Sequence, residues 1–348
     1  MTMDSRQIIF GIDSFGDLPQ NEDGKLMTQA QAIRQVVTEG ILADNLGLDV
    51  IALGEHHRSE YAISSPETVL AGIATQTKKI TLASGVTVLS SDDPVRVYER
   101  FATLDALSNG RAEVVLGRGS FTESFPLYGY DLSDYNLLFE EKIELFTKLL
   151  TEKAVTWSGK TRAALTDVEV YPKTERGRLA ARIAVGGSPE SVVRAARYGF
   201  PITLAIISGS PKRFVSYVEL YRKAAQKFAT QAFPIGIHSH GVIAESDEEA
   251  VDLAWKHIRK SFVRIGKERG WRPMGKAQFE KEVKNGSIYA GAPETVAQRL
   301  AATIKQLDAG RFELAYGAGE LPVQARLKTI ELYATKVVPR VKELLAKE

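Results

Sequence analysis

The sequence contains no cysteine among its 348 residues. This absence excludes disulfide bonds, thiolate metal sites and a cysteine nucleophile, and it is compatible with the cytoplasm. No apolar run approaches the ~20 residues of a membrane-spanning helix, and the first residues do not resemble a secretory leader. We therefore expect a cytoplasmic protein that has no membrane partner.

An excess of charge of one sign is also absent. The 45 Lys and Arg residues are nearly balanced by 43 Asp and Glu residues, which leaves a net charge of +2. This charge is too small to indicate nucleic acid or an anionic membrane as the partner, and we find no basic cluster backed by aromatic residues. The composition, with 44% hydrophobic and 25% charged residues, is typical of a globular protein.

The sequence does contain a repeated punctuation of helices and strands. Helix-like stretches end in glycine immediately before strand-like runs, at Gly47, Gly110, Gly199 and Gly310. Glycine suits these positions because the residue after a helix often has a left-handed conformation. The opposite junctions pair a capping residue with proline, at Ser65-Pro66, Asp93-Pro94, Ser188-Pro189 and Ser210-Pro211. This alternation is typical of βα units.

Eight candidate strands follow from this pattern. They are Ile8–Ile12, Val50–Gly54, Ile80–Leu89, Ala112–Gly117, Ile183–Gly187, Ile202–Ile207, Ile235–Val242 and Phe312–Tyr316. The number favours an α/β fold of the (β/α)8 TIM-barrel type over a doubly wound sheet. We expect one domain over residues 1–348, with insertions near 154–178, as a β-hairpin, and near 256–290. Because long insertions after barrel strands often cover the site, the second, around Trp271, is a candidate lid.

Two of the five histidines, His56 and His57, stand together where the strand at Val50–Gly54 ends. In parallel sheets the chemistry lies beyond the carboxyl ends of the strands, so these imidazoles are candidate site residues. A pair of hydrogen-bonded structural histidines is the alternative. We expect no metal site, because adjacent histidines diverge and no His-Glu-x-x-His spacing occurs. His238 and His240 alternate along a strand, so they share a face and are expected to line the barrel interior or its mouth.

Two further stretches suggest an anion site. In Ile183–Ser191, a strand, a glycine pair and the helix start at Ser188-Pro189 follow one another. Glycines allow close approach of backbone amides, and a helix N-terminus attracts phosphate; an ordinary capped turn is the alternative. Arg118, between two glycines, is expected to bind an anion at the barrel mouth or else to pair with Glu113 or Glu123.

Taken in order, these pieces resemble the bacterial-luciferase-like flavin monooxygenases. The resemblance rests on Gly54–His57, Ser84–Leu89, Asp93–Val97, Leu107–Ala112, Gly117–Ser120 and Ala184–Ser191. It implies a TIM barrel that binds reduced FMN, usually delivered by a separate NAD(P)H:flavin reductase. It further implies oxidation of a small organic substrate by dioxygen through a flavin hydroperoxide, and a homodimer. A deazaflavin-dependent oxidoreductase of the same fold and a non-catalytic flavin-binding protein remain the alternatives.

The resemblance also assigns residues. It implies that His56 is the catalytic histidine and that Val185 borders the flavin ring, while Gly85-Val86 matches a stretch that often has a cis peptide bond under the ring. The cofactor contacts are further assigned to Arg118, Gly119, Gly186, Gly187, Ser188 and Ser191. Candidate residues of the substrate pocket are Phe15, His57, Tyr61, Phe121 and Tyr128. Gly117 replaces the reactive cysteine of light-emitting members, and Gly187 replaces an acidic residue of some members, so we do not expect light emission.

Overall fold

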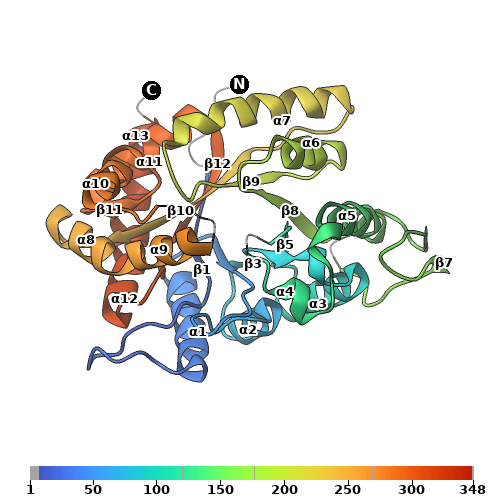
Figure 1. The fold of residues 1–348 in the computed structure, drawn as a ribbon, viewed down its shortest axis with the longest axis horizontal. Helices are drawn as coiled ribbons and strands as arrows, with labels where there is room; N and C mark the ends of the chain where they lie inside the picture. Colours follow the sequence, from blue (N-terminus) through green and yellow to red (C-terminus); the bar gives the residue numbers. More distant parts are fainter. Residues whose placement is uncertain (1–7, 120, 176, 269, 271, 347–348) are drawn as a thin grey trace.

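Eight parallel strands close into a barrel in the computed structural model, which describes residues 8–119, 121–175, 177–268, 270 and 272–346 (Figure 1). In order around the barrel, the strands are β1 (Ile9–Ser14), β2 (Val50–Leu53), β3 (Thr81–Ser84), β5 (Ala112–Gly117), β8 (Ala180–Val185), β9 (Ile202–Ala205), β10 (Ile235–Ile243) and β12 (Ala309–Ala315). Pairing of β12 with β1 closes the ring. The predicted (β/α)8 fold is therefore confirmed.

Helices surround the barrel (Figure 1). They are α1 (Gln29–Asn45), α2 (Pro66–Ala74), α3 (Pro94–Leu107), α4 (Ser124–Leu127), α5 (Tyr135–Thr151), α6 (Pro189–Arg197), α7 (Val215–Lys227), α8 (Asp247–Leu253), α9 (Arg259–Glu268), α10 (Lys276–Asn285), α11 (Pro293–Leu307), α12 (Val323–Leu332) and α13 (Val338–Ala346). Shorter 3-10 or π segments are η2 (Leu89–Ser91), η3 (Leu132–Asp134), η4 (Pro211–Phe214), η5 (Ala254–Ile258) and η6 (Tyr333–Val337). Side-chain caps begin several of them; the Asp93 carboxylate, for example, accepts hydrogen bonds from the backbone N–H groups of Val95 and Arg96.

The structure differs from the predicted strands at one place that matters for the site. The run 80–89 is not one strand, because β3 ends at Ser84 and a short β4 (Thr87–Val88) follows. The intervening Gly85–Val86 peptide bond is cis.

The two predicted insertions have regular structure of their own. Residues 154–178 contain the antiparallel strands β6 (Val155–Trp157) and β7 (Leu165–Val168). Residues 256–290 contain α9, α10 and most of β11 (Tyr289–Gly291), which pairs with β10. Trp271, around which a lid was expected, lies outside the described residues.

Because side chains alternate along each strand, the buried residues form one group outside the barrel strands and another inside them. Phe10 and Ile12 of β1 belong to the large apolar cluster between barrel and helices, whereas Asp13 lines the barrel cavity. A smaller apolar group inside the barrel consists of Val50, Ala52, Ala83 and Val115. The barrel interior therefore combines a small apolar layer with polar side chains.

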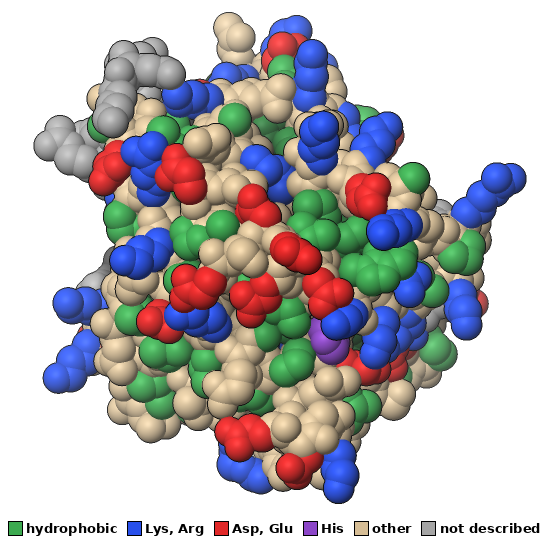
Figure 2. All heavy atoms as spheres, turned by 90° about the vertical axis from the view of Figure 1, so that its left-hand side faces the viewer, with side chains coloured by type: hydrophobic (Ala, Val, Ile, Leu, Met, Phe, Trp, Pro, Cys, Tyr) green, Lys and Arg blue, Asp and Glu red, His purple; other side chains and the backbone are tan. Residues whose placement is uncertain are grey.

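The length of the helices and the charge on the surface are relevant to the partners considered from the sequence. Among the described residues, no helix has both the length and the apolar character needed to cross a bilayer. Acidic and basic side chains are intermingled over the face shown in Figure 2, with small apolar areas between them. This face agrees with the near balance of charge in the sequence.

Candidate active site

A cavity of about 440 Å³ opens where the carboxyl ends of the barrel strands meet. Small-molecule sites in proteins commonly have volumes of this order, ~300–1,000 Å³. Its walls include Phe15 after β1, His56 after β2, Gly85 after β3, Arg118 after β5 and Gly186 after β8. Because these strands are parallel, one set of loops brings together residues that are far apart in the sequence.

His56 lies among aromatic rings in this cavity. Its ring stacks on Tyr61, with centroids 4.4 Å apart, and meets the edges of Phe15 at 5.3 Å and Phe121 at 5.1 Å. Its Nδ1 atom lies 3.5 Å from a carboxylate oxygen of Glu123. Burial raises the pKa of Glu123, but the hydrogen bond to His56 and backbone bonds outweigh it and hold that pKa below its usual value. His56 is therefore held in place by an ionised carboxylate and a ring stack.

His57 has a different environment, which a buried carboxylate dominates. Its Nε2 atom lies 2.9 Å from Glu55, whose other oxygen accepts a hydrogen bond from the Val88 N–H group at 2.8 Å. The bond to Glu55 raises the pKa of His57. His57 and Glu55 thus connect the ends of β2 and β4, and both line the cavity.

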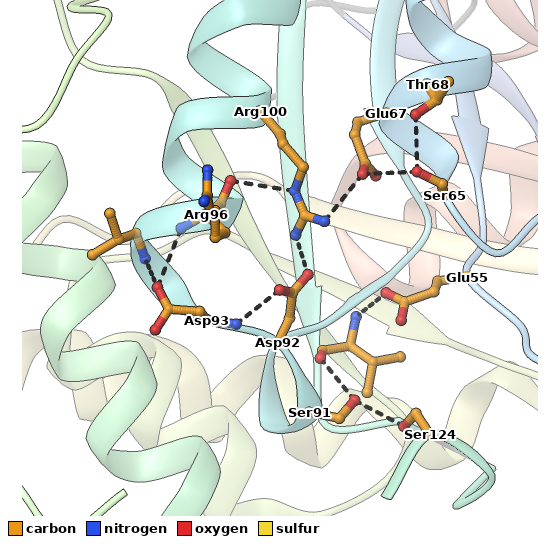
Figure 3. A network of polar contacts seen from close by, with 12 residues as sticks. Glu55, Ser65, Glu67, Thr68, Ser91, Asp92, Asp93, Arg96, Arg100 and Ser124 are labelled. Carbon is orange, nitrogen blue, oxygen red and sulfur yellow. Dashed lines mark hydrogen bonds and ion pairs between the residues drawn. The ribbon is translucent and has the colours of Figure 1, made fainter. Parts of the chain in front are cut away.

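A polar network continues behind Glu55 (Figure 3). Arg100 of α3 pairs with Asp92 and, at 3.2 Å, with Glu67 of α2. The Ser91 hydroxyl donates to Val88 O and to Ser124 Oγ at 2.8 Å. These bonds hold the loop after β4 between α2, α3 and α4, which stabilises the wall that carries Glu55.

The opposite end of the cavity has the features of an anion site. Gly186, Gly187, Ser188 and Ser191 line it at the N-terminus of α6, where the Ser188 hydroxyl oxygen caps the helix by accepting from Ser191 N–H. Gly187 has a φ of 120°, which favours glycine, and its carbonyl oxygen accepts a 2.8 Å hydrogen bond from the Tyr217 hydroxyl. A Cβ atom at Gly186 or Gly187 would meet no atom within 4 Å, so the loop faces open space.

Arg118 completes this end of the cavity. Its guanidinium donates to the side-chain oxygen of Asn136 at 3.2 Å and lies 5.1 Å from the centre of the Tyr135 ring. The carboxylates that we considered as partners have other contacts, because Glu113 pairs with Arg311 and Glu123 with His56. The hydrogen bond and ring contact of Arg118 at the rim are thus to neutral groups. Its charge also acts on the Glu190 carboxylate at the start of α6, where a hydrogen bond from Ser188 and the charge of Arg118 lower the pKa of Glu190.

The wall between these two ends is formed by close backbone packing. Gly85, Val86 and Gly117 line the cavity together with Gly119. A Cβ atom at Gly117 would lie 2.6 Å from Val86 Cγ2, so a side chain at this position would require Val86 to move.

Three predicted residues do not line the cavity. Val185 is fully buried in the outer apolar core, since side chains alternate along β8 and it is Ala184 that faces inward. Tyr61 is also buried and lies behind two lining residues, with its ring stacked on His56 and tilted toward Phe121. Tyr128 is 52% exposed and lies beside His57, on the outer side of the Glu55 wall, in a second cavity.

Other lining residues escaped the predicted set. Asp13, Glu313 and Thr203 reach the cavity from β1, β12 and β9, and Tyr135 reaches it from α5. His238 and His240 also line it, which agrees with the shared face expected from their alternation along β10. A charged residue within an apolar strand run, as at Asp13 and Glu313, was the signal that could have identified these positions.

The sequence pattern of the family described as luciferase-like monooxygenase matches residues 15–305. The chain is 29% identical over 213 residues to the alkanal monooxygenase alpha chain of the Kryptophanaron alfredi symbiont, covering 61% of this chain and 59% of that protein. It is 28% identical over 306 residues to N-acetyl-S-alkylcysteine monooxygenase of Bacillus subtilis (strain 168), covering 81% and 86%. The match thus spans less than two thirds of the first of these relatives.

Solved structures with the same fold include enzymes with different cofactors. Monooxygenase RslO1 from Streptomyces bottropensis matches with a TM-score of 0.82 and 22% identity over 95% of this chain and 99% of that one. The oxygenating constituent of 3,6-diketocamphane monooxygenase from Pseudomonas putida, in complex with FMN, matches with a TM-score of 0.75 and 19% identity. This match covers 96% of this chain and 99% of that one. The coenzyme F420 dependent tetrahydromethanopterin reductase of Methanopyrus kandleri matches with a TM-score of 0.71 and 18% identity. This match covers 96% of this chain and 99% of that one. These identities show the barrel fold and leave the type of flavin open.

Proposed function

Since this chain belongs to the luciferase-like monooxygenase family, we propose that it is an FMN-dependent monooxygenase that oxidises a small organic substrate with reduced FMN and dioxygen. One observation carries the proposal: a single cavity connects an anion site at the N-terminus of α6 with an imidazole at His56. The size of the cavity, about 440 Å³, suits a small cofactor and a small substrate.

The donor groups of the cavity fit an FMN phosphate. Arg118 supplies a cation, Ser188 and Ser191 supply hydroxyl groups, and the first turn of α6 supplies the positive end of a helix dipole. The open space at Gly186 and Gly187 permits close approach of the phosphate to the backbone. One feature opposes this, because the Ser188 hydroxyl donates to Glu190 at 2.6 Å, and phosphate binding requires that hydroxyl to turn away from the carboxylate.

The residues around His56 would handle protons and exclude water. A bound reduced flavin supplies two electrons for the reduction of dioxygen. His56, paired with Glu123 through Nδ1, can accept or hold a proton at its other ring nitrogen, beside the cavity wall at Gly85 and Val86 where we propose that the flavin binds. Phe15 and Phe121, which contact the His56 ring, keep this part of the cavity apolar. An apolar surrounding strengthens each polar contact within it.

The partners form part of the proposal. We propose that a separate NAD(P)H:flavin reductase supplies reduced FMN in the cytoplasm, and that the protein is a homodimer. The FMN-bound neighbour is described as the oxygenating constituent of its enzyme, and this supports a division of labour between oxygenation and flavin reduction.

Titration with FMN and with the deazaflavin coenzyme tests the cofactor. We expect the double variant Arg118→Ala with Ser188→Ala to bind FMN at least ~100-fold more weakly, since charge-assisted hydrogen bonds contribute ~1.5–3 kcal/mol each and ~1.4 kcal/mol corresponds to tenfold. Ser210→Ala is the matched control, because Ser210 also caps a helical segment before a proline but does not line the cavity. Equal FMN binding by parent and double variant, or micromolar binding of the deazaflavin alone, would refute the assignment.

Turnover tests the reaction itself. Reduced FMN, dioxygen and a panel of aldehydes, ketones, thioethers and aromatic compounds should give oxygenated product with the parent protein. His56→Ala should lower the rate by a factor of ~10²–10⁴, the range for loss of a general acid–base group. Release of hydrogen peroxide alone across the panel, by parent and variant alike, would favour a non-catalytic flavin-binding protein.

A further inference from the structure

The floor of the cavity contains a buried polar cluster that the proposed reaction has not used. Asp13 of β1, His238 of β10 and Glu313 of β12 come from three neighbouring strands, and their nearest polar atoms lie within 4.8 Å of one another. Their exposed fractions are only 1%, 6% and 2%. Charged groups at this depth need partners, because burial without compensation is costly.

The charges on the floor nearly cancel without a bound ion. Arg311 pairs with Glu113 at 2.5 Å and also with Glu313, and Arg182 lies in the same layer. Two arginines therefore balance two glutamates. The carboxylate of Asp13 remains, and the group that faces it is His238, with Nδ1 3.4 Å from Asp13 Oδ2. One proton on this pair completes the charge balance.

The surroundings hold one proton on this pair. Burial lowers the pKa of His238, but the facing carboxylates of Asp13 and Glu313 outweigh it and raise the pKa above its ordinary value. Burial also raises the pKa of the Asp13 carboxyl, although the charge of His238 opposes this, so the proton is held between the two groups. His240, two residues along β10, is the opposite case, since burial and the charge of His238 lower its pKa to about 3. The charged or titratable groups around His238 are Asp13, His56, Glu113, Arg182, His240, Arg311 and Glu313.

The pair faces the reaction space. Asp13 and His238 both line the cavity, and within the described part of the chain the buried atoms Asp13 Oδ1 and His238 Nε2 have no hydrogen-bond partner. The Asp13 carboxylate lies against the cavity wall at Gly85, because a Cβ atom at Gly85 would be 2.5 Å from Oδ2. The Phe15 ring contacts the imidazoles of both His238 and His56. Its centroid lies 5.5 Å from that of His238 and 5.3 Å from that of His56.

We propose that Asp13 and His238 form a second acid–base site on the cavity floor, in which His238 Nε2 donates a proton to an oxygen atom of the bound reactants and Asp13 positions the ring. This inference rests on the proposed function. In the overall reaction, dioxygen, the substrate and the two electrons and two protons of reduced FMN give oxygenated substrate, water and oxidised FMN. The N–H bond of His238 breaks as an O–H bond forms on the oxygen that leaves as water. One of the two flavin protons then restores His238.

A divalent cation is the competing occupant of this cluster. Asp, His and Glu are suitable ligands for such ions. We favour a proton because Arg311 already pairs with Glu313, and because both arginines place positive charge in the same layer. Metal binding is therefore an outcome of the test.

Nitrogen NMR of the histidine side chains in the apoprotein tests the protonation. The chain has five histidines, so single variants assign every signal. We expect the His238 imidazole to be protonated at both nitrogens at pH 7, and Asp13→Asn to lower its titration midpoint by at least one pH unit. A neutral His238 in the parent at pH 7, or a midpoint unmoved by Asp13→Asn, would overturn the proposal. So would stoichiometric binding of Zn²⁺ or Mn²⁺ that displaces the His238 proton.

Kinetics then test the catalytic role. His238→Gln should lower kcat by ~10²-fold or more, with the Kd for FMN within threefold of the parent, and it should remove the alkaline limb of the kcat profile. Asp13→Asn should move that limb to lower pH. His257→Gln is the matched control, since His257 is buried outside this cavity. An unchanged kcat and pH profile in His238→Gln overturns this inference alone, whereas a parent protein with no FMN-dependent oxygenation overturns the proposed function and the inference with it.

Discussion

At the scale of single residues, Gly117 shows how packing restricts the cavity wall at Gly85 and Val86, where we propose that the flavin binds. A Cβ atom there would lie 2.6 Å from Val86 Cγ2 and within 3.1 Å of Val86 Cβ. We expect Gly117→Ala to displace Val86 and to weaken FMN binding about tenfold, because the wall would then project into the cavity. Calorimetric titration measures the effect. The double variant Gly117→Ala with Val86→Ala should recover most of the affinity, and failure to recover would show that the clash is not the cause.

Lys142 is a second residue with a measurable consequence. Its side chain is buried, donates to Ser90 O at 2.7 Å and lies 4.0 Å from the centre of the Tyr130 ring. Burial lowers the pKa of Lys142 to about 8. Between pH 8 and ~10 the unfolded chain holds this proton and the folded chain does not, so the stability contributed by Lys142 rises with pH.

Urea unfolding at pH 7.5 and pH 9.5 measures this dependence in the parent and in Lys142→Met. We expect the free energy of unfolding of the parent, relative to that of the variant, to be larger at pH 9.5 than at pH 7.5. The same pH dependence in both proteins would mean that Lys142 titrates normally in the folded state.

At the scale of elements, α9 is the part of the second insertion nearest the cavity. Phe262 of α9 packs edge to face on His240, with centroids 5.4 Å apart, and Arg264 lies 3.6 Å from Glu60 in the loop after β2. We propose that α9 covers the cavity on the side of His240 and helps to exclude water. Phe262→Ala should raise the fraction of dioxygen released as hydrogen peroxide severalfold and leave the Kd for FMN unchanged.

The ratio of peroxide to oxygenated product gives the readout for this helix. Phe228→Ala is a suitable control, because Phe228 ends α7 and is 37% exposed. If both variants couple oxygen use to product as well as the parent does, α9 is not a cover for the site.

At the scale of the whole molecule, a buried charged layer spans the barrel. Arg311 of β12 reaches Glu113 of β5 across the interior at 2.5 Å, and Arg182 of β8 donates to Thr203 of β9 at 3.1 Å. Removing one partner leaves an uncompensated buried charge. Glu113→Ala should therefore lower the free energy of unfolding by ~3–5 kcal/mol.

An exposed pair provides the comparison for that layer. Glu343, 60% exposed in its side chain, lies 3.0 Å from Arg340. Glu343→Ala should cost no more than ~1 kcal/mol. Denaturant unfolding distinguishes the two, and equal losses would mean that the buried layer contributes no more than a surface ion pair.

Much of this architecture could be predicted from local features of the sequence. Glycine after helices and Ser-Pro or Asp-Pro before them indicated where the elements begin and end, and the strand bounds Ala112–Gly117 agree with the structure. The strand 80–89 was predicted without its break, because nothing local distinguishes Gly85 from a glycine within a regular strand. For the site, the loop after each strand was identifiable, whereas the direction of each side chain was not.

The sequence by itself determined the order of βα units, the absence of thiol chemistry, and the placement of His56, Arg118 and Ser188 after strands. These depend on composition, periodicity and capping, which act within a few residues. Only the tertiary structure decided that Ala184 rather than Val185 faces the cavity, and that Asp13 meets His238. Barrel closure sets those contacts, since the register between β1, β12 and β10 determines which distant side chains share the interior.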